Sequence, residues 1–197
     1  MEQQLAPALG RLRTLLEEAS TALHVPVTFA LIGGLAVSAW GAVRATQDID
    51  LLADSDPSPI SDRQLRDALA KYLAKRNCVI EWRIGAADDP IPLLLKVGLP
   101  GARRRVGADI LWAHRRWHQD ALRRRLQIPL GRTHVFVLHP EDLILMKLDA
   151  GGPQDILDVQ TLLEARPREL DMRRLKRNAA RIRLKQSLAR CLPKKKR

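Results

Sequence analysis

Apolar residues at helical spacing open the chain. Leucine and alanine recur every three or four positions between residues 2 and 23, at Leu5, Leu9, Leu12, Leu15, Leu16, Ala19 and Leu23. This period predicts an amphipathic helix, which ends before Pro26. A short apolar run over residues 27–32 follows, and two glycines stop it, which favours a buried strand over a helix. Small residues over 35–42 then predict a short helix.

Further along the chain, short apolar or alternating runs predict strands, and wider apolar periods predict helices. Strands are expected at residues 48–52, 78–84, 91–97, 106–112 and 134–138, and helices at 61–76, 140–151, 155–166 and 171–192. Residues 114–125 are charged and are expected to form a helix or a loop. The pattern predicts an α/β (α+β) protein, in which a small mixed sheet is flanked by helices and followed by a C-terminal helical part.

The length of 197 residues suits one α/β domain with an appendage, or two small domains. We divide the chain into a core with its N-terminal helix at 1–138, a helical region at 139–192 and a basic tail at 193–197. Hydrophobic residues make up 46% but aromatic residues only 4%, so the expected core is aliphatic. No apolar run approaches about eighteen residues and no signal-peptide pattern is present, so we expect no membrane association. Cys78 and Cys191 form no disulfide or zinc pattern, which favours a cytoplasmic location.

Positive charge is concentrated at the C-terminal end. The chain has 34 Lys and Arg against 22 Asp and Glu, a net charge of +12. Twelve of the basic residues lie in 172–197, which has no acidic residue, so the rest of the chain is neutral overall. A neutral body with a cationic arm indicates a polyanionic partner. The alternative is a solvated tail without a fixed partner.

The candidate chemistry lies in residues 27–52. Gly33 and Gly34 predict a turn that leads into a helix, and such a turn exposes backbone N–H groups that suit a phosphate. Asp48 and Asp50 are two residues apart on a predicted strand, so their side chains share one face. Two adjacent carboxylates repel each other unless a positive charge lies between them, and Mg²⁺ prefers such hard oxygen ligands. The stretch therefore predicts a divalent-metal site beside a phosphate-binding turn.

This combination resembles the nucleotidyltransferase superfamily, and most of all its minimal nucleotidyltransferase and AbiEii-toxin-like branch. The motif comprises a glycine pair, an Arg-x-Thr and an Asp-x-Asp, here Gly33, Gly34, Arg44, Thr46, Asp48 and Asp50. The resemblance implies the nucleotidyltransferase fold, an NTP held at the glycine turn, and Mg²⁺ or Mn²⁺ held by the paired aspartates and a third from a later strand. Asp109, inside the apolar run 106–112, matches that third residue. The alternative for Asp109 is a strand-end residue in a surface salt bridge.

A second stretch, residues 139–163, extends the resemblance. It carries a lysine, an aspartate eight residues on and another aspartate after three more, here Lys147, Asp155 and Asp158. The resemblance implies that Lys147 reaches the triphosphate and that Asp155 positions it or the second substrate; the alternative is an ordinary exposed lysine. Family members usually have two basic residues before the first aspartate, where this chain has Gly-Pro-Gln at 152–154. The arginines at 103–105 are candidates to replace that charge.

Other polar residues of these stretches have two interpretations. Arg44 either meets phosphate through its planar guanidinium or pairs locally with Asp48 or Asp54. Thr46 either shapes the loop or contacts the nucleotide. His114 and His118 are four residues apart but lack the glutamate of a His-Glu-x-x-His site, so surface or packing roles are expected for them.

The resemblance implies an Mg²⁺-dependent nucleotidyltransferase that moves a nucleoside monophosphate from an NTP to an acceptor, with Asp48, Asp50, Asp109 and Lys147 as catalytic residues. The basic C-terminal helix and tail favour RNA, such as tRNA, as the acceptor; a protein acceptor is the alternative. Relatives occur as toxin–antitoxin components, which implies an antitoxin protein as a further partner. The competing hypothesis is a degenerate member of the family that binds nucleic acid or a partner without turnover.

Overall fold

The computed structural model describes residues 2–41, 44–55, 63–86, 92–101, 105–130 and 133–193. Within these ranges a mixed sheet of seven strands has the order β3-β4-β5-β2-β1-β7-β6. Its strands are β1 (Val27–Ile32), β2 (Ile49–Ser55), β3 (Val79–Ile84), β4 (Leu93–Leu99), β5 (Val106–Trp112), β6 (Leu126–Leu130) and β7 (Thr133–Val137). The helices are α1 (Glu2–Leu23), α2 (Gly33–Ala39), α3 (Arg63–Ala74), α4 (Arg116–Arg123), α5 (Pro140–Ala150), α6 (Pro153–Ala165), α7 (Met172–Arg181) and α8 (Lys185–Cys191).

The sheet is mixed because parallel and antiparallel neighbours alternate around its centre. β1 and β2 are antiparallel, β2 is parallel to β5, and β5, β4 and β3 pair in antiparallel fashion. On the other side β1 is parallel to β7, and β7 is antiparallel to β6. The central strands β1 and β2 contain consecutive buried residues, as expected for strands covered on both faces, whereas β5 alternates buried and half-buried positions.

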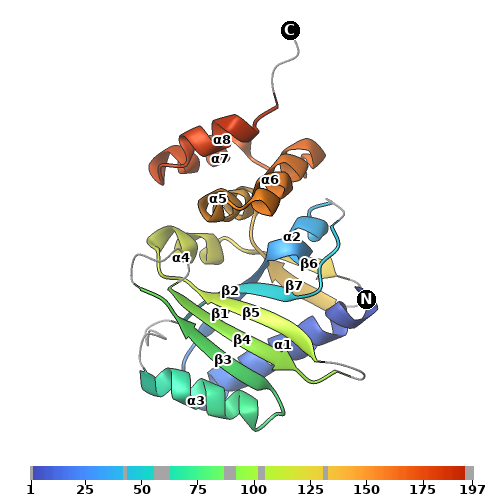
Figure 1. Ribbon diagram of the computed structural model, residues 1–197, viewed down its shortest axis with the longest axis vertical. Coiled ribbons are helices and arrows are strands. Elements are labelled where there is room, and N and C mark those ends of the chain that lie inside the picture. The colour runs from blue at the N-terminus through green and yellow to red at the C-terminus, as the bar shows by residue number, and fades with distance from the viewer. Residues whose placement is uncertain are drawn as a thin grey trace.

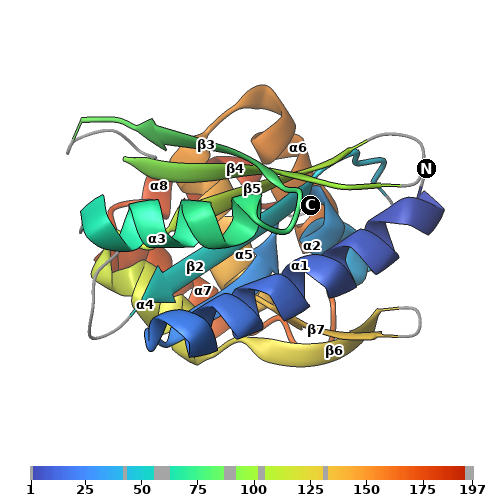
Figure 2. The same cartoon turned by 90° about the horizontal axis from the view of Figure 1, so that it is seen from below.

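Helices α1 and α3 cover one face of the sheet, and the C-terminal helices lie on the opposite side (Figures 1 and 2). The leucine stripe of α1 is buried: Leu9, Leu12 and Leu16 are at most 2% exposed. Leu69 and Leu73 of α3 are buried as well. Burying such a side chain contributes about 1.5–3 kcal/mol, so these two stripes explain why the helices pack against the sheet.

Helix α5 lies between the sheet and the later helices (Figure 1). Two buried carboxylates in its first turn hold neighbouring segments. Glu141 accepts a 2.8 Å hydrogen bond from the backbone N–H of Asp171, where α7 begins, and Asp142 accepts one of 2.8 Å from Arg124, after α4. Helices α7 and α8 bury their few apolar side chains, Leu175, Ala179, Leu188 and Cys191. Their remaining faces are largely basic and exposed.

The expected elements are largely present, but one expectation was wrong and one strand was missed. The single helix expected at 171–192 is two helices, because Arg183 between them has φ 65° and a left-handed residue cannot continue an α-helix. Strand β6 was not expected, since it is a short edge strand whose Pro129 weakens the pattern and is tolerated only at an edge or a bulge. The short helix expected at 35–42 begins at Gly33 and ends at Ala39.

Some expectations lie outside the described residues. They include the arginines at 103 and 104 and the last four residues of the basic tail. None of the helices in the described ranges is both long and apolar enough to cross a membrane.

Candidate active site

Three aspartates lie on the face of the sheet that α1 does not cover. Asp48 and Asp50 flank Ile49, which is 0% exposed and points to the opposite, core face. In the parallel pair β2–β5, Asp50 lies directly opposite Asp109. Neighbouring strands are about 4.8 Å apart, so the two carboxylates start from adjacent backbone positions. The structure thus brings the Asp-x-Asp pair beside the third aspartate of the resemblance.

Two glycines make room for these carboxylates. Gly33 has φ 65°, and a Cβ at this position would collide with the side chain of Asp50. Gly107 on β5 lies beside Asp48, and a Cβ there would be 2.5 Å from Asp48 Oδ1. The glycines are therefore required by close approach, in one case together with a left-handed backbone.

The Asp50 carboxyl is surrounded by more negative charge than its neighbours offset. Its pKa is raised from 3.8 to about 6, first by burial and then by the charge of Asp109, with a further contribution from Asp48. Lys147 and Arg44 act in the opposite direction. Both effects disfavour the ionised form of Asp50. A cation bound at this position would offset the cost of burying the charged carboxylate and the repulsion from Asp109.

Lys96 is a member of this cluster that sequence reasoning missed. Its Nζ lies 2.9 Å from Asp109 Oδ2, and the two residues are directly opposite each other in the β4–β5 pair. Asp109 thus forms the salt bridge considered as an alternative in the sequence analysis, and it does so on the face of the sheet that also carries Asp50. A single lysine within the apolar run 93–99 was the available signal, but its register against Asp109 could not be read from the sequence.

The carboxylates match a hard divalent cation in chemistry, although they do not converge on one point. Among the described residues, no group of three or more His, Cys, Asp or Glu side chains has the arrangement of metal ligands. The donors are nevertheless carboxylate oxygens, which Mg²⁺ and Mn²⁺ prefer, and burial together with the charge of Asp109 raises the pKa of Asp50, so a cation beside it would be favourable. Asp48, Asp50 and Asp109 therefore stay predicted ligands of such a cation.

A network of ion pairs lies beside the glycine turn. Lys147 Nζ on α5 is 2.8 Å from Asp155 Oδ1 and 2.9 Å from Asp158 Oδ2, both on α6. Arg44 Nη1 is 2.6 Å from the same oxygen of Asp158. The side chain of Lys147 is only 12% exposed and that of Asp158 only 3%, so Lys147 is not an ordinary surface lysine.

The loop between α2 and β2 packs against the glycine turn. A Cβ on Gly34 would lie 2.9 Å from Thr46 Cβ and 3.2 Å from Arg44 Nη1. The Thr46 hydroxyl donates a 3.3 Å hydrogen bond to the carbonyl of Asp48, so this residue shapes the loop. The ion pair found for Arg44 is with Asp158, 114 residues away in sequence, rather than with either of the local aspartates considered above.

The residues that replace the family's usual basic pair have structural contacts of their own. The N–H of Gly152 donates to Asp155 Oδ2 at 3.3 Å, and Gln154 Nε2 donates to Asp158 Oδ1 at 3.2 Å. They therefore hold the two aspartates at the start of α6. Arg105, the described member of the proposed replacement run, donates to two backbone carbonyls at 2.6 and 3.1 Å, so its guanidinium is already engaged.

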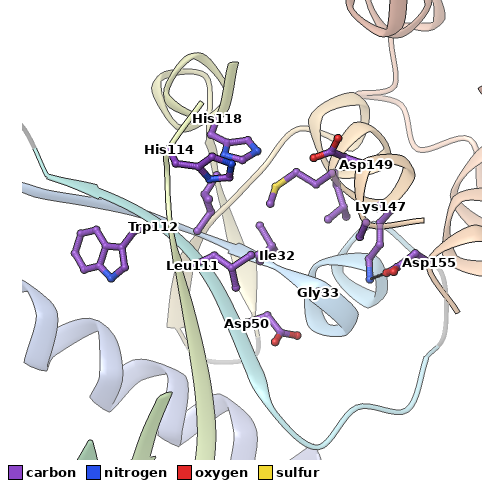
Figure 3. A pocket seen from close by; sticks show the side chains of 14 residues that line it. Ile32, Gly33, Asp50, Leu111, Trp112, His114, His118, Lys147, Asp149 and Asp155 are labelled. Carbon is purple, nitrogen blue, oxygen red and sulfur yellow. Dashed lines mark hydrogen bonds and ion pairs between the residues drawn. The ribbon is translucent and has the colours of Figure 1, made fainter. Parts of the chain in front are cut away.

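A pocket of about 350 Å³ lies between the sheet and α5 (Figure 3). This volume is within the range of small-molecule sites. Its polar part is lined by Gly33, Asp50, Lys147 and Asp155. The remainder is lined mainly by apolar and imidazole side chains: Ile32, Leu52, Leu111, Trp112, His114, His118, Leu143 and Met146, with Asp149 and Ala150. One cavity thus joins the glycine turn and a carboxylate to an uncharged compartment.

His118 is buried at this pocket, with 5% of its surface exposed. Burial lowers its pKa from 6.5 to about 3, with smaller contributions from His114 and Arg115, so the ring is neutral at physiological pH. The ring of Trp117 packs edge-on against it, with 4.1 Å between the centroids. The packing role expected for this histidine is present, but its place at the pocket was missed because it depends on how α4 is placed after β5.

Solved structures share this fold. An antigenic nucleotidyltransferase-like protein from Paracoccidioides brasiliensis is 17% identical with a TM-score of 0.51, over 94% of this chain and 92% of that one. The antibiotic-resistance factor ANT(2'')-Ia is 14% identical with a TM-score of 0.53, over 91% of this chain and 94% of that one. At such identities the likeness shows the fold alone, and it confirms the expected nucleotidyltransferase fold. No curated protein matches the sequence significantly.

The protein-family comparison identifies the class. The family described as "Nucleotidyltransferase of unknown function (DUF6036)" matches residues 10–188, and the chain belongs to this family. It is therefore a nucleotidyltransferase, an enzyme class that transfers a nucleoside monophosphate from an NTP. The superfamily expected from the sequence motifs is confirmed, whereas the AbiEii-like branch stays a prediction.

Proposed function

We propose that this nucleotidyltransferase transfers a nucleoside monophosphate from an NTP to a hydroxyl group of RNA and releases pyrophosphate, with Mg²⁺ held by Asp48, Asp50 and Asp109. The register of β2 and β5 carries the proposal, because it sets Asp50 opposite Asp109. Asp50 lines the same pocket as Gly33 and Lys147. A metal-binding carboxylate and the groups that suit a triphosphate therefore face one cavity.

In this proposal the triphosphate lies between the glycine turn and α5. Gly33 lets the backbone approach phosphate oxygens closely, and Lys147 and Arg44 supply positive charge. Both cations are held in place by Asp158 and are part of one network. Phosphoryl transfer needs little covalent work from the protein, so positioning and charge stabilisation supply most of the rate.

The carboxylates have two tasks at the reacting phosphorus. They orient the metal, and one of them accepts the proton of the acceptor hydroxyl. When bound, Mg²⁺ supplies the positive charge that offsets the charge developing on the transferred group. Lys96 contacts Asp109 at 2.9 Å and keeps this side chain on the shared face.

RNA is supported as the acceptor by the exposed basic surface of the last two helices. Within the described residues this surface comprises Arg173, Lys176, Arg177, Arg183, Lys185 and Arg190, all of them exposed. Arg181 of α7 lies 3.7 Å from Asp120 of α4, so the surface reaches the helix that bounds one end of the pocket. A phosphate backbone bound here would bring an RNA end toward the cavity without base recognition.

Label transfer tests the proposal. Purified protein is incubated with Mg²⁺, total tRNA and each NTP in turn, radiolabelled at its α-phosphate, and the RNA is separated by electrophoresis. At least one NTP is expected to label the RNA, and an Asp48→Asn/Asp50→Asn double variant is expected to lose the signal. Asp67→Asn is the matched control, because Asp67 is an exposed acid on α3, across the sheet from the site. Salt-sensitive RNA binding without transfer from any NTP would support the degenerate binding protein instead.

The acceptor surface is tested separately. Replacing Arg173, Lys176 and Arg177 with glutamine should lower the slope of log affinity against log salt by about 0.7 per lost phosphate contact on single-stranded RNA. Transfer to tRNA should fall with affinity, while NTP binding stays unchanged. Unchanged transfer to tRNA would show that these helices do not present the acceptor.

The resemblance to AbiEii-like toxins extends the proposal to a growth-inhibiting role with an antitoxin partner. Induced expression in a bacterial host is expected to arrest growth, and the Asp48→Asn/Asp50→Asn variant is expected to relieve the arrest at equal protein level. Arrest that persists in this variant would separate any toxicity from nucleotidyl transfer.

A further inference from the structure

The uncharged compartment of the pocket, away from the glycine turn, has a composition of its own. Leu143 and Met146 of α5 line it together with Leu111 of β5 and the imidazoles of His114 and His118. Figure 3 shows these two imidazoles together at one side of the cavity, with Asp50 and the Lys147–Asp155 pair at other sides. Leucine, thioether and imidazole groups favour a planar, uncharged ring over a phosphate.

The charged residues at this end do not change that preference. Asp149 lines the pocket, but both of its carboxylate oxygens accept hydrogen bonds from Arg115 Nη1, at 2.9 and 2.8 Å. The pair is therefore neutral as a unit. His118 is neutral because it is buried. A polyanionic RNA backbone finds no net positive charge in this compartment, so the acceptor's phosphates have to lie elsewhere.

His118 also carries an unsatisfied polar atom. Its Nδ1 is buried and has no hydrogen-bond partner in the part of the chain that the structure describes. A proton on Nδ1 would be a buried donor without an acceptor, so the neutral ring is expected to carry its proton on Nε2. Buried side chains with unpaired polar atoms are uncommon, and here the residue lines a cavity that a ligand can enter.

We propose that this compartment holds the base of the donor NTP, packed between His118 of α4 and Met146 of α5, with the unpaired Nδ1 of the His118 imidazole accepting a hydrogen bond from the edge of the base. The inference rests on the proposed function, because it needs the triphosphate at the glycine turn and Lys147. It goes further by naming the residues that bind the nucleoside and contribute to the choice of NTP.

Binding of NTPs is compared with binding of inorganic tripolyphosphate, each as its Mg²⁺ complex, by isothermal titration calorimetry on the full chain. Wild-type protein should bind at least one NTP about tenfold or more tightly than tripolyphosphate, since the base adds packing contacts that tripolyphosphate cannot make. His118→Leu should remove most of this difference and leave tripolyphosphate affinity unchanged. His118→Gln, which keeps a side chain that can accept a hydrogen bond at this position, should retain more of it.

Lys147→Met is the reciprocal control, because it should weaken NTP and tripolyphosphate alike. Equal affinity of wild-type protein for tripolyphosphate and all four NTPs would overturn the inference and leave the proposed function standing. The same holds if His118→Leu, with an unchanged melting temperature, binds every NTP as wild type does. Absence of binding to both NTPs and tripolyphosphate would overturn the proposed function and this inference together. The wild-type comparison needs no variant, so it decides the matter even if a substitution unfolds the protein.

Discussion

Replacing Asp50 with asparagine is expected to stabilise the protein while it abolishes nucleotidyl transfer. Asparagine has almost the same shape as aspartate, so it fits beside Gly33, but it carries no charge. In the wild type the Asp50 carboxylate is partly buried and faces Asp109 and Asp48. Removing the charge therefore removes the cost of burying it and the repulsion from Asp109, neither of which the unfolded chain has.

The magnitude follows from the pKa of Asp50, which is about 6 in the folded protein against 3.8 ordinarily. Because a tenfold change in proton affinity corresponds to about 1.4 kcal/mol, ionised Asp50 destabilises the folded state by about 3 kcal/mol at pH 8. A raised acid pKa means that the folded state binds the proton more tightly than the unfolded state does. The loss of folding stability therefore grows as pH rises from about 4 and is nearly complete above pH 6. At pH 5 the advantage of the variant should be roughly half as large, and below about pH 4 it should vanish.

Urea denaturation at pH 5 and pH 8, without divalent metal, measures this difference. Asp67→Asn on α3 is the control and should stay within about 0.5 kcal/mol of wild type at both pH values, because Asp67 is exposed. Added Mg²⁺ should stabilise wild type more than Asp50→Asn, since a ligand stabilises only the state that binds it. If Asp50→Asn is no more stable than wild type at pH 8, ionised Asp50 does not destabilise the folded state.

Three further predictions concern single residues. Asp158→Ala removes the shared partner of two partly buried cations and should lower the free energy of unfolding by about 1–3 kcal/mol in urea denaturation, with Asp158→Asn less harmful. The pKa of His118 is about 3 in the folded protein against 6.5 ordinarily, so the unfolded chain takes up the proton first as pH falls. Protonation of His118 alone should therefore lower the free energy of unfolding by about 2 kcal/mol between pH 7.5 and pH 5, and His118→Gln should lack this component. Gly33→Ala should destabilise by about 1–3 kcal/mol in thermal melts because of its φ of 65° and the collision with a carboxylate, whereas Gly10→Ala on α1 meets nothing within 4 Å and should not.

Much of the fold could be predicted because its central strands are short apolar runs with clear stops. The run before Gly33 and the alternation around Asp109 each specify a strand and the face on which its polar residue lies. The break at Arg183 could not be predicted, because nothing in the local basic pattern distinguishes a left-handed arginine from a helical one. Strand β6 depends on pairing with β7, a contact that local propensity does not contain.

The candidate site divides in the same way. The spacing of Asp48 and Asp50 is a local property, so their shared face could be predicted. Lys96 and His118 come to the site through strand register and through the position of α4, which are set by contacts between distant segments. The pairing of Arg44 with Asp158 spans 114 residues, and no local pattern indicates it.

Asp158 has a consequence for how the enzyme can change. The Oδ2 atom of this buried carboxylate contacts both Arg44, in the loop before β2, and Lys147, on α5. Incoming phosphate oxygens would compete with this carboxylate for the same two cations. In the proposed function, a substitution that changes triphosphate affinity at these cations therefore also changes the ion pairs between the loop before β2 and helices α5 and α6. Substrate affinity and the stability of this contact are thus coupled.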